Sequence, residues 1–550
     1  MENHMKKIVL LNALFNEFML AEPMSICALS SYLKRDGHEV TLIDPSIQGM
    51  NIEEIIDCIF NLSPDIFGIS IHRDTNKMDA LYIAKELRNK GYKGFICAGG
   101  HGPSIGILNE GKYNTMYTSP SYLELGCYID VFIIGEGELT LSEIASIEKY
   151  EKHELKMIKG IAYIENDAFV VTNAREKISD LDTLPYIDRS MLRVLKDKFP
   201  IDASASITSG RGCPYDCSFC SVKSYERSQC LPYYRLRSID NILDEIKQIN
   251  QLYGIKNFNF EDDSICAGDR KSIDRLIEFA ERIICEKMNI TFSMYMRIDL
   301  INKKLIELLS CAGLNNIFVG VENIDQNILD FLDKNLLVDT IMEKNDELLN
   351  AGFSHELGSE KRIMVGYINF LPMSNYETLM KSYNFVRENK ITPKALRRKL
   401  RLYTGTTMVD KIIRLGYYDD NNLQGWRYED SFIFSLRLKI NSFFNFIFDI
   451  RDKIRTIEKF NKAQKLDIKH GINIDNIITY RKKLDEFCFD FYLNSVEIIN
   501  KSGDRELLLT RYYNDSKDRV LYNQDVQDII KITNDYYKKY SIDSIDLFRR

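Results

Sequence analysis

Three cysteines lie close together near the middle of the chain. Cys213, Cys217 and Cys220 follow the pattern Cys-x3-Cys-x2-Cys. Gly212 and Pro214 disfavour a regular helix at the start of this segment, so we expect a loop that brings the three thiols round one centre. Thiolates bind iron–sulfur clusters, and a four-iron cluster held by three cysteines keeps one iron without a protein ligand. An open coordination position is typical of a site that binds a substrate or cosubstrate.

A closed zinc site and a disulfide cluster are the alternatives for these thiols. Structural zinc sites usually have four ligands, commonly as two Cys-x2-Cys pairs. No second pair follows here, and Cys230 is near enough to be a conceivable fourth ligand. Disulfides are disfavoured because the twelve cysteines of this 550-residue chain are mostly scattered through apolar runs. The spacing therefore favours the open cluster.

The cysteine motif, with aromatic Phe219 directly before its last cysteine, resembles the signature of the radical S-adenosylmethionine (radical SAM) enzymes. The resemblance implies a 4Fe–4S cluster whose fourth iron is chelated by the amino and carboxylate groups of S-adenosylmethionine. It also implies that the reduced cluster cleaves this cosubstrate to a 5′-deoxyadenosyl radical, which abstracts hydrogen from a substrate. Phe219 would then lie near the adenine, although ordinary core packing is an equal alternative for a phenylalanine.

Length and charge limit the classes of protein that fit. A chain of 550 residues is too long for one core and indicates about three domains. The formal net charge of −7 and a pI near 5.7 make nucleic-acid binding an unexpected function. We find no stretch apolar enough to span a membrane and no signal peptide at the start, and therefore expect a cytoplasmic protein with reduced thiols.

The first part of the chain, residues 1–150, alternates short apolar runs with helical patterns. This alternation predicts an α/β domain with a doubly wound, Rossmann-like parallel sheet. Ligands of such sheets bind at the carboxyl ends of the strands. The strands that we expect span residues 7–11, 39–44, 66–71, 94–98 and 131–134.

Residues 22–40, 99–103 and 135–138 resemble segments of the cobalamin-binding domain that precedes the radical domain in one large radical SAM subfamily. The resemblance implies that cobalamin binds at the strand ends, in loops that include residues 12–20 and 70–74. The candidate contacts are Asn12, Ser70, His72, Gly99, Gly100, His101, Gly135, Glu136 and Gly137. The Asp-x-His-x-x-Gly loop that supplies a cobalt ligand in methionine synthase is absent, so we expect no histidine ligand from that loop. His72 and His101 are better explained as loop hydrogen-bonding residues.

A second cluster in the first domain is the rival interpretation. Methylthiotransferases carry one on three N-terminal cysteines, and Cys27, Cys58 and Cys97 have a superficially similar spacing. Two of these fall within predicted helices and one within a buried-looking strand, which are places where cysteine acts as a small hydrophobic residue. Core packing is therefore the preferred interpretation for all three.

Residues 151–200 are predicted to be a linker with a β-hairpin at 161–164 and 168–171. About six strand–helix repeats follow over residues 201–425, which predicts a partial (β/α)6 barrel whose sixth strand spans 396–403. Residues 426–550 have helical apolar patterns and form a predicted C-terminal helical domain, for which the family offers no motif.

Four polar residues are predicted at the carboxyl ends of the barrel strands, where active sites of such barrels lie. They are Glu261, Asp262, Arg297 and Glu322. The resemblance implies that they bind or position S-adenosylmethionine. A salt bridge or helix cap is an equally good explanation for each of them taken singly.

These observations predict an enzyme that uses the cluster, S-adenosylmethionine and cobalamin to methylate an unactivated carbon of a peptide or small-molecule substrate. An external electron donor such as flavodoxin or ferredoxin is expected. The alternative within the class is a cyclisation, ring contraction or other rearrangement without methyl transfer. A non-catalytic cobalamin or cluster sensor is a further alternative, but such sensors usually carry an output module, and we find none in the sequence.

Overall fold

The structure is a computed structural model that describes residues 5–13, 21–72, 76–110, 120–198, 203–230, 232–356, 358–422, 424–463, 474–528 and 530–531. Most of the expected loop 12–20, and the end of the loop 70–74, lie outside these ranges.

The first domain is built on a seven-stranded sheet in the order β2-β1-β3-β4-β5-β6-β7. Its first five strands are parallel, as the alternation predicted. Nearly every residue of the central strands is buried, because helices cover both faces of a doubly wound sheet. The strands are β1 (Lys7–Asn12), β2 (Glu39–Ile43), β3 (Ile66–Ser70), β4 (Phe95–Gly99), β5 (Val131–Ile133), β6 (Ile161–Glu165) and β7 (Ala168–Val171).

Two pairs of helices enclose this sheet. Helices α3 (Ile52–Leu62) and α4 (Lys77–Asn89) pack on one face, and α1 (Met24–Arg35) and α7 (Glu138–Ser146) on the other. The hairpin that we predicted in the linker is β6–β7. It pairs antiparallel with β5 and therefore extends the sheet of the first domain.

A second, fully parallel sheet has the order β14-β13-β12-β11-β8 and forms the curved wall of the barrel. Its strands are β8 (Ala205–Ile207), β11 (Asn257–Phe260), β12 (Thr291–Arg297), β13 (Leu314–Glu322) and β14 (Arg362–Tyr367). The helices that follow these strands include α11 (Ile239–Tyr253), α12 (Arg270–Cys285), α13 (Lys303–Cys311), α15 (Val338–Asn350) and α16 (Tyr376–Glu388).

The sixth barrel strand that we predicted over 396–403 is much reduced. The chain there makes a single parallel bridge, Phe370↔Lys399, and no strand. Phe370 lies beyond the end of β14. The bridge therefore adds one residue pair to the barrel wall, at the carboxyl end of the place where a sixth strand was expected.

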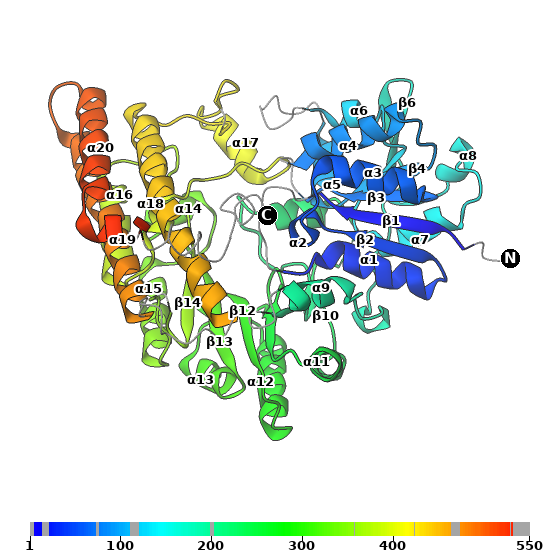
Figure 1. The fold of residues 1–550 in the computed structure, drawn as a ribbon, viewed down its shortest axis with the longest axis horizontal. Helices are drawn as coiled ribbons and strands as arrows, with labels where there is room; N and C mark the ends of the chain where they lie inside the picture. The colour runs from blue at the N-terminus through cyan, green and yellow to red at the C-terminus, as the bar shows by residue number, and fades with distance from the viewer. Residues whose placement is uncertain are drawn as a thin grey trace.

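Three helices at the end of the described chain, α18 (Phe432–Ala463), α19 (Ile474–Glu497) and α20 (Arg505–Leu521), pack on the side of the barrel away from the first domain (Figure 1). Their apolar residues share one continuous core with the barrel. Asn369 Nδ2 donates to the buried Tyr492 hydroxyl at 2.8 Å, and the buried Trp426 indole donates to the Leu400 carbonyl. Within the described ranges, no helix combines the length and apolar composition that a bilayer crossing requires.

A buried ion network joins the first domain to the barrel. Arg189 Nη1 lies 2.6 Å from Glu22 Oε2, and Arg189 Nη2 lies 2.8 Å from Glu245 Oε1 on α11. Glu22 Oε2 also accepts from the backbone N–H of Ser206 in β8. The network therefore fixes the first domain against the first strand of the barrel, so that the two domains lie side by side (Figure 1).

Candidate active site between the two domains

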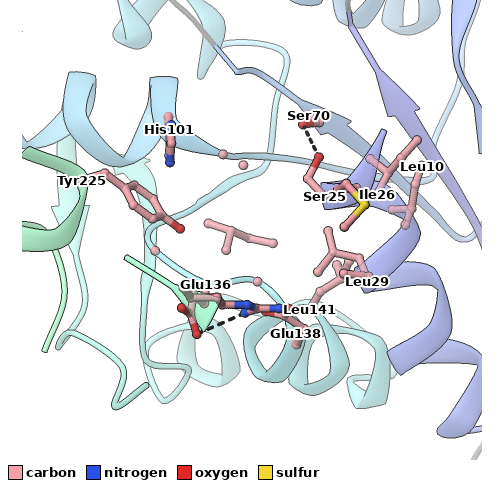
Figure 2. A pocket seen from close by; sticks show the side chains of 18 of the residues that line it. Leu10, Ser25, Ile26, Leu29, Ser70, His101, Glu136, Glu138, Leu141 and Tyr225 are labelled. Carbon is pink, nitrogen blue, oxygen red and sulfur yellow. Dashed lines mark hydrogen bonds and ion pairs between the residues drawn. The ribbon is translucent and has the colours of Figure 1, made fainter. Parts of the chain in front are cut away.

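A cavity of about 340 Å³ lies between the first domain and the barrel. The first domain contributes the ends of β3 and β4, the loop after β5 and the inner face of α1, and the barrel contributes the loops after β8 and β11. One side is apolar and the other carries ionisable groups (Figure 2). The carboxyl ends of both sheets therefore face one space, as is usual for ligand sites of α/β folds.

The three cysteines of the motif lie in the loop between β9 (Gly210–Arg211) and α10 (Ser221–Arg227). All three are half-buried. Gly212 has φ +84°, and a Cβ atom there would lie 1.8 Å from the Tyr233 carbonyl oxygen, so only glycine fits this turn. The turn presses the loop against the strand β10 (Arg235–Leu236), which pairs with β9.

Burial disfavours the thiolate form of two of the motif cysteines. Burial raises the pKa of Cys220 to about 12 and also raises the pKa of Cys213. Metal binding must therefore release protons from these thiols.

The positively charged guanidinium of Arg297 lies beside Cys217. Arg297, predicted at the end of β12, has Nη1 3.8 Å from Cys217 Sγ, and its guanidinium lies 4.2 Å from the centre of the Tyr215 ring. Asp299 holds the guanidinium through contacts of 3.0 and 3.1 Å. A cation at this position stabilises negative charge on a thiolate or a cluster. Arg297 is thus placed to act on the cluster as well as on a cosubstrate carboxylate.

Glu322 and Phe219 meet round a buried lysine. Lys334 Nζ lies 3.0 Å from Glu322 Oε1 and 6.0 Å from the centre of the Phe219 ring. Burial lowers the pKa of Lys334, but the charges of Glu322 and Cys217 outweigh this effect, and the net pKa is raised. Glu322 has φ +65°, a strained conformation for this residue type. The two predicted residues therefore belong to one cluster beside the cysteine loop.

The three consecutive acids after β11 point in different directions. Glu261 and Asp263 line the cavity. Burial raises the pKa of both, to about 6 for Asp263. Asp262, in contrast, is buried away from the cavity, and its carboxylate accepts from the backbone N–H and the hydroxyl of Ser209. Asp262 therefore holds the backbone at Ser209, just before the cysteine loop. It does not line the cavity, so the structure does not support the contact with S-adenosylmethionine that we predicted for this residue.

Seven of the nine residues expected to contact cobalamin line the cavity: Ser70, Gly99, Gly100, His101, Gly135, Glu136 and Gly137. Asn12 and His72 are not among the lining residues. Asn12 is buried, and its Nδ2 donates to Asp44 Oδ2 at 2.7 Å. The His72 ring stacks on that of His101 at 5.4 Å between centroids.

His101 is the imidazole that faces the cavity. Its ring lies between His72 and Tyr225, with 4.1 Å between its centroid and that of Tyr225, and the tyrosine hydroxyl also points into the cavity (Figure 2). Burial, followed by the nearby His72, lowers the pKa of His101 to about 4. His101 is therefore neutral at ordinary pH and can offer a ring nitrogen to a ligand.

The cavity suits a broad ligand that approaches the backbone closely. Gly100 has φ +107°, and a Cβ atom there would lie 2.8 Å from the Ile71 carbonyl oxygen. The bare backbone of the glycine-rich corners leaves the strand ends open. The apolar side is formed by Leu10, Ile26, Leu29, Cys97, Ile133 and Leu141. A broad ligand with both apolar and polar parts, such as the corrin ring of cobalamin with its amide side chains, suits this combination.

The N-terminal cysteines pack as the sequence predicted. Cys27 is buried in α1 and Cys97 in β4, while Cys58 is half-buried in α3. Burial raises the pKa of Cys97 to about 12. These thiols are core residues, and the structure gives no support to a second cluster among them.

Arginines from the barrel hold the glycine-rich loop after β5. Arg211, in the cysteine loop, donates to Glu138 at 2.6 Å. Arg235 forms an ion pair with Glu136, in which Arg235 Nη1 donates to Glu136 Oε2 at 3.1 Å. The backbone N–H of Glu136 donates to Gln229 Oε1 at 3.1 Å. The loops of the two domains are therefore directly connected.

Our sequence-based list of site residues omitted Arg211, Tyr225, Arg235, Glu138 and Asp263. Glu138 stands within the segment 135–138 and Arg211 lies two residues before Cys213, so their charges next to predicted motifs were a usable signal. Tyr225 and Arg235 have no local signal, because only the contact between the domains brings them to the cavity.

Two family models match the chain. The model of the Radical SAM superfamily matches residues 207–386, and that of the B12 binding domain matches residues 19–111. An uncharacterized methyltransferase of Pyrococcus horikoshii is 28% identical over 341 residues, which are 61% of this chain and 68% of that protein. An anaerobic magnesium-protoporphyrin IX monomethyl ester cyclase of Rubrivivax gelatinosus is 27% identical over 378 residues, which are 66% of this chain but only 62% of the relative.

The fold is also that of a solved structure. OxsB, a cobalamin-dependent S-adenosylmethionine radical enzyme solved with aqua-cobalamin and S-adenosylmethionine bound, superposes with a TM-score of 0.71 at 17% identity. The superposition covers 99% of this chain and 82% of OxsB. The two matched domains are those that contribute the two halves of the cavity. The chain therefore joins a B12 binding domain to a radical SAM domain, and its cofactors are cobalamin, a 4Fe–4S cluster and S-adenosylmethionine.

Proposed function

We propose that this enzyme methylates an unactivated carbon of its substrate. The observation that carries the proposal is a cavity of about 340 Å³ that both domains line with residues at their strand ends; Gly212, next to the first motif cysteine, lines it, while the three cysteines lie behind this lining. When bound, the cofactors supply a hydrogen-abstracting radical and a transferable methyl group. A shared cavity suits a reaction in which both must reach the same carbon, because positioning supplies much of the rate of such reactions.

The chain's own residues hold and orient these groups in this proposal. Cys213, Cys217 and Cys220 bind the cluster, and Arg297 stabilises its negative charge. Glu322 positions S-adenosylmethionine beside Phe219. At the other side, Ser70, His101 and the glycine-rich loops at 99–100 and 135–137 cradle the cobalamin.

The stoichiometry of the proposed methylation determines which cosubstrates and how many electrons the enzyme requires. Two molecules of S-adenosylmethionine and two electrons convert a substrate C–H bond to C–CH3, and they yield S-adenosylhomocysteine, methionine and 5′-deoxyadenosine. The hydrogen lost by the substrate ends in the 5′-deoxyadenosine. The electrons come from an external donor, for which we propose flavodoxin or ferredoxin.

The relatives support two reaction types. The Pyrococcus relative is named a methyltransferase, which favours methyl transfer, while the Rubrivivax relative is named a cyclase. A cyclisation without methyl transfer is therefore the second candidate. It would consume S-adenosylmethionine for radical generation alone and would leave no S-adenosylhomocysteine.

Anaerobic reconstitution with iron, sulfide and cobalamin tests the proposal. The enzyme is then incubated with S-adenosylmethionine, a reductant and candidate substrates, and its products are analysed by mass spectrometry. Substrate-dependent formation of both S-adenosylhomocysteine and 5′-deoxyadenosine, with a substrate mass gain of one methylene, is the expected result. Formation of 5′-deoxyadenosine alone, with loss of hydrogen or isomerisation of the substrate, would overturn methylation in favour of the cyclase reaction.

A further inference from the structure

An aromatic pair lies on the inner face of the barrel wall. Side chains of a strand alternate between its two faces. On β12, Met294 and Met296 are buried in the core that the wall shares with its helices. The alternate positions, Tyr295 and Arg297, therefore face into the barrel. Phe318 faces the same way, because it is the register partner of Tyr295 on β13.

The rings of Tyr295 and Phe318 lie together, with 5.1 Å between their centroids. Tyr295 is 38% exposed, although β12 has a neighbouring strand on each side. The tyrosine hydroxyl makes no hydrogen bond to any residue that the structure describes. The two side chains, which we call the aromatic pair, thus offer an apolar surface with one polar group inside the barrel.

On one side, the aromatic pair reaches the residues round Lys334. A Cβ atom on Gly366 of β14 would lie 3.1 Å from Cζ of Phe318 and 3.5 Å from Glu322 Oε2. The ring and the carboxylate therefore approach one point on the wall, which Gly366 leaves open. Glu322 in turn holds Lys334 at 3.0 Å, and Lys334 Nζ lies 6.0 Å from the centre of the Phe219 ring. The aromatic pair is thus continuous with the residues that we propose to position S-adenosylmethionine.

On the other side, the aromatic pair borders the cavity between the domains. Asn259 of β11 and Ser293 of β12 are register partners, and the Ser293 hydroxyl donates to Asn259 Oδ1 at 2.8 Å. Glu261 and Tyr295 each follow two residues later and so reach the same level of the wall. In agreement, burial and then the charge of Glu261 raise the pKa of Tyr295. Since Glu261 lines the cavity, the aromatic pair extends the barrel side of that cavity.

The aromatic pair lies one level below the cysteine loop. Arg297 follows Tyr295 by two positions, which is about 7 Å along a strand. Its Nη1 lies 3.8 Å from Cys217 Sγ. One level further from the loop the wall is polar, and Asn259 Nδ2 donates to Ser204 Oγ at 2.9 Å. The pair is therefore an apolar level between the cysteine loop and a polar level.

We propose that the substrate carries a planar ring, which packs on Tyr295 and Phe318 while the Tyr295 hydroxyl donates to a polar group on it. The inference rests on the proposed function in that the barrel receives the substrate, and it holds for methylation and cyclisation alike. Planar rings gain offset or edge contacts with aromatic side chains that a puckered ring of the same size does not. The adenine of S-adenosylmethionine is the competing occupant, but Phe219 already serves it in the proposed function.

The test compares a flat probe with a puckered one on the reconstituted holoenzyme. S-Adenosylmethionine and cobalamin are kept at saturation, and reductant is omitted so that no cleavage occurs. The probes are 2-naphthol and decahydro-2-naphthol, which share a ring skeleton and a hydroxyl group. Equilibrium dialysis with mass-spectrometric detection gives both dissociation constants, and 2-naphthol should bind at least about fivefold more tightly. No turnover is needed, so the result is independent of the reaction type.

Variants locate the bound probe. Tyr295→Ala and Phe318→Ala should each weaken 2-naphthol binding at least about fivefold, while Tyr295→Phe, which keeps the ring, should weaken it less. Gly366→Ala should also weaken it, because the new Cβ atom displaces the Phe318 ring although both rings remain. Tyr82→Ala, at a tyrosine of α4 with a similar exposure of 45%, is the matched control and should bind as wild type. Circular dichroism and the cluster absorbance show that each variant is folded and loaded.

Three outcomes would overturn the proposal. Equal affinity of wild type for the two probes would exclude a planar-ring site. Equal 2-naphthol affinity in wild type, Tyr295→Ala and Phe318→Ala would place the probe elsewhere on the protein. Competition between 2-naphthol and S-adenosylmethionine, with weaker S-adenosylmethionine binding in Tyr295→Ala, would assign the aromatic pair to the adenine. A failure of the proposed function would be seen separately, as absence of S-adenosylhomocysteine in the product assay, and would leave these affinities unchanged.

Discussion

Arg211 and Glu138 connect the cysteine loop to the glycine-rich loop of the cobalamin-binding domain, with Arg211 Nη2 2.6 Å from Glu138 Oε1. Glu138 is buried, and burial alone would raise its pKa. The charge and hydrogen bond of Arg211 outweigh that effect, so the pKa of Glu138 is lowered. This ion pair is one of several contacts that join the loops of the two cofactor sites, and its part in their coupling is open to experiment.

Glu138→Gln should destabilise the protein and weaken cobalamin binding, because Arg211 would be left without its main partner. Loss of one member of a buried pair costs about 3 kcal/mol. Urea unfolding of the apoprotein and a spectroscopic cobalamin titration measure the two effects. Asp240→Asn, which removes the exposed partner of Arg282, is the control and should change stability by less than about 1 kcal/mol. An unchanged cobalamin affinity in Glu138→Gln would refute the coupling.

The ion pair of Arg211 and Glu138 should also make the stability of the protein depend on pH in the acid range. Since the pKa of Glu138 is lowered in the folded protein, its contribution is complete above the ordinary pKa of 4.5. The contribution is lost as the pH falls through the lower folded value. The difference in unfolding free energy between wild type and Glu138→Gln should therefore be constant above pH 4.5 and shrink below it.

Substitution of any motif cysteine should abolish the cluster. Cys213→Ala, Cys217→Ala and Cys220→Ala should each lose the iron-dependent absorbance and all S-adenosylmethionine cleavage, because a cubane with two protein ligands is not retained. Iron analysis and optical spectra after anaerobic reconstitution provide the measurement. Cys311→Ala, at an exposed cysteine, is the control. Loss of metal in Cys230→Ala, together with zinc in the wild type, would instead indicate a four-ligand zinc site.

His101 should make the apoprotein sensitive to mild acid. Its folded pKa of about 4 lies below the ordinary value of 6.5, so the unfolded chain binds the proton first. Stability should therefore fall as the pH drops from about 6.5 to about 4, by at most about 3 kcal/mol from this group. Thermal unfolding of His101→Gln over this range should show a smaller pH dependence than wild type.

Two other histidines serve as controls for this effect. His153→Gln should behave as wild type, because that side chain is exposed. His355→Gln should also reduce the acid sensitivity, since burial lowers the pKa of His355 to about 4. A pH dependence identical in wild type and His101→Gln would show that His101 takes up its proton in the folded protein as readily as in the unfolded chain.

Glu322→Gln should weaken S-adenosylmethionine binding without loss of the cluster. The substitution removes the negative charge that pairs with the buried Lys334 beside Phe219. We expect at least a tenfold increase in the dissociation constant, measured by equilibrium dialysis on the reconstituted enzyme. Glu347→Gln, in a pair with Lys344 away from the cavity, is the control. Equal affinity in the two variants would assign Glu322 a purely structural role.

The sequence by itself determined the local features. The spacing of Cys213, Cys217 and Cys220 predicted the cluster loop, and the alternation of apolar and helical segments predicted both parallel sheets. Such features follow from short stretches of chain, because thiol spacing and strand periodicity need no distant partner. The glycine-rich corners at 99–100 and 135–137 could be predicted for the same reason, and at Gly100 a Cβ atom would lie 2.8 Å from the Ile71 carbonyl oxygen.

The tertiary structure alone decided which side chains share the cavity. It turned Asp262 toward Ser209 and Asn12 toward Asp44, although both stand at strand ends as predicted. It brought Tyr225 against His101 and Arg235 against Glu136 across the boundary between the domains. These contacts join residues about one hundred positions apart, and they depend on how two separately folded sheets pack together, which no local pattern in the sequence encodes.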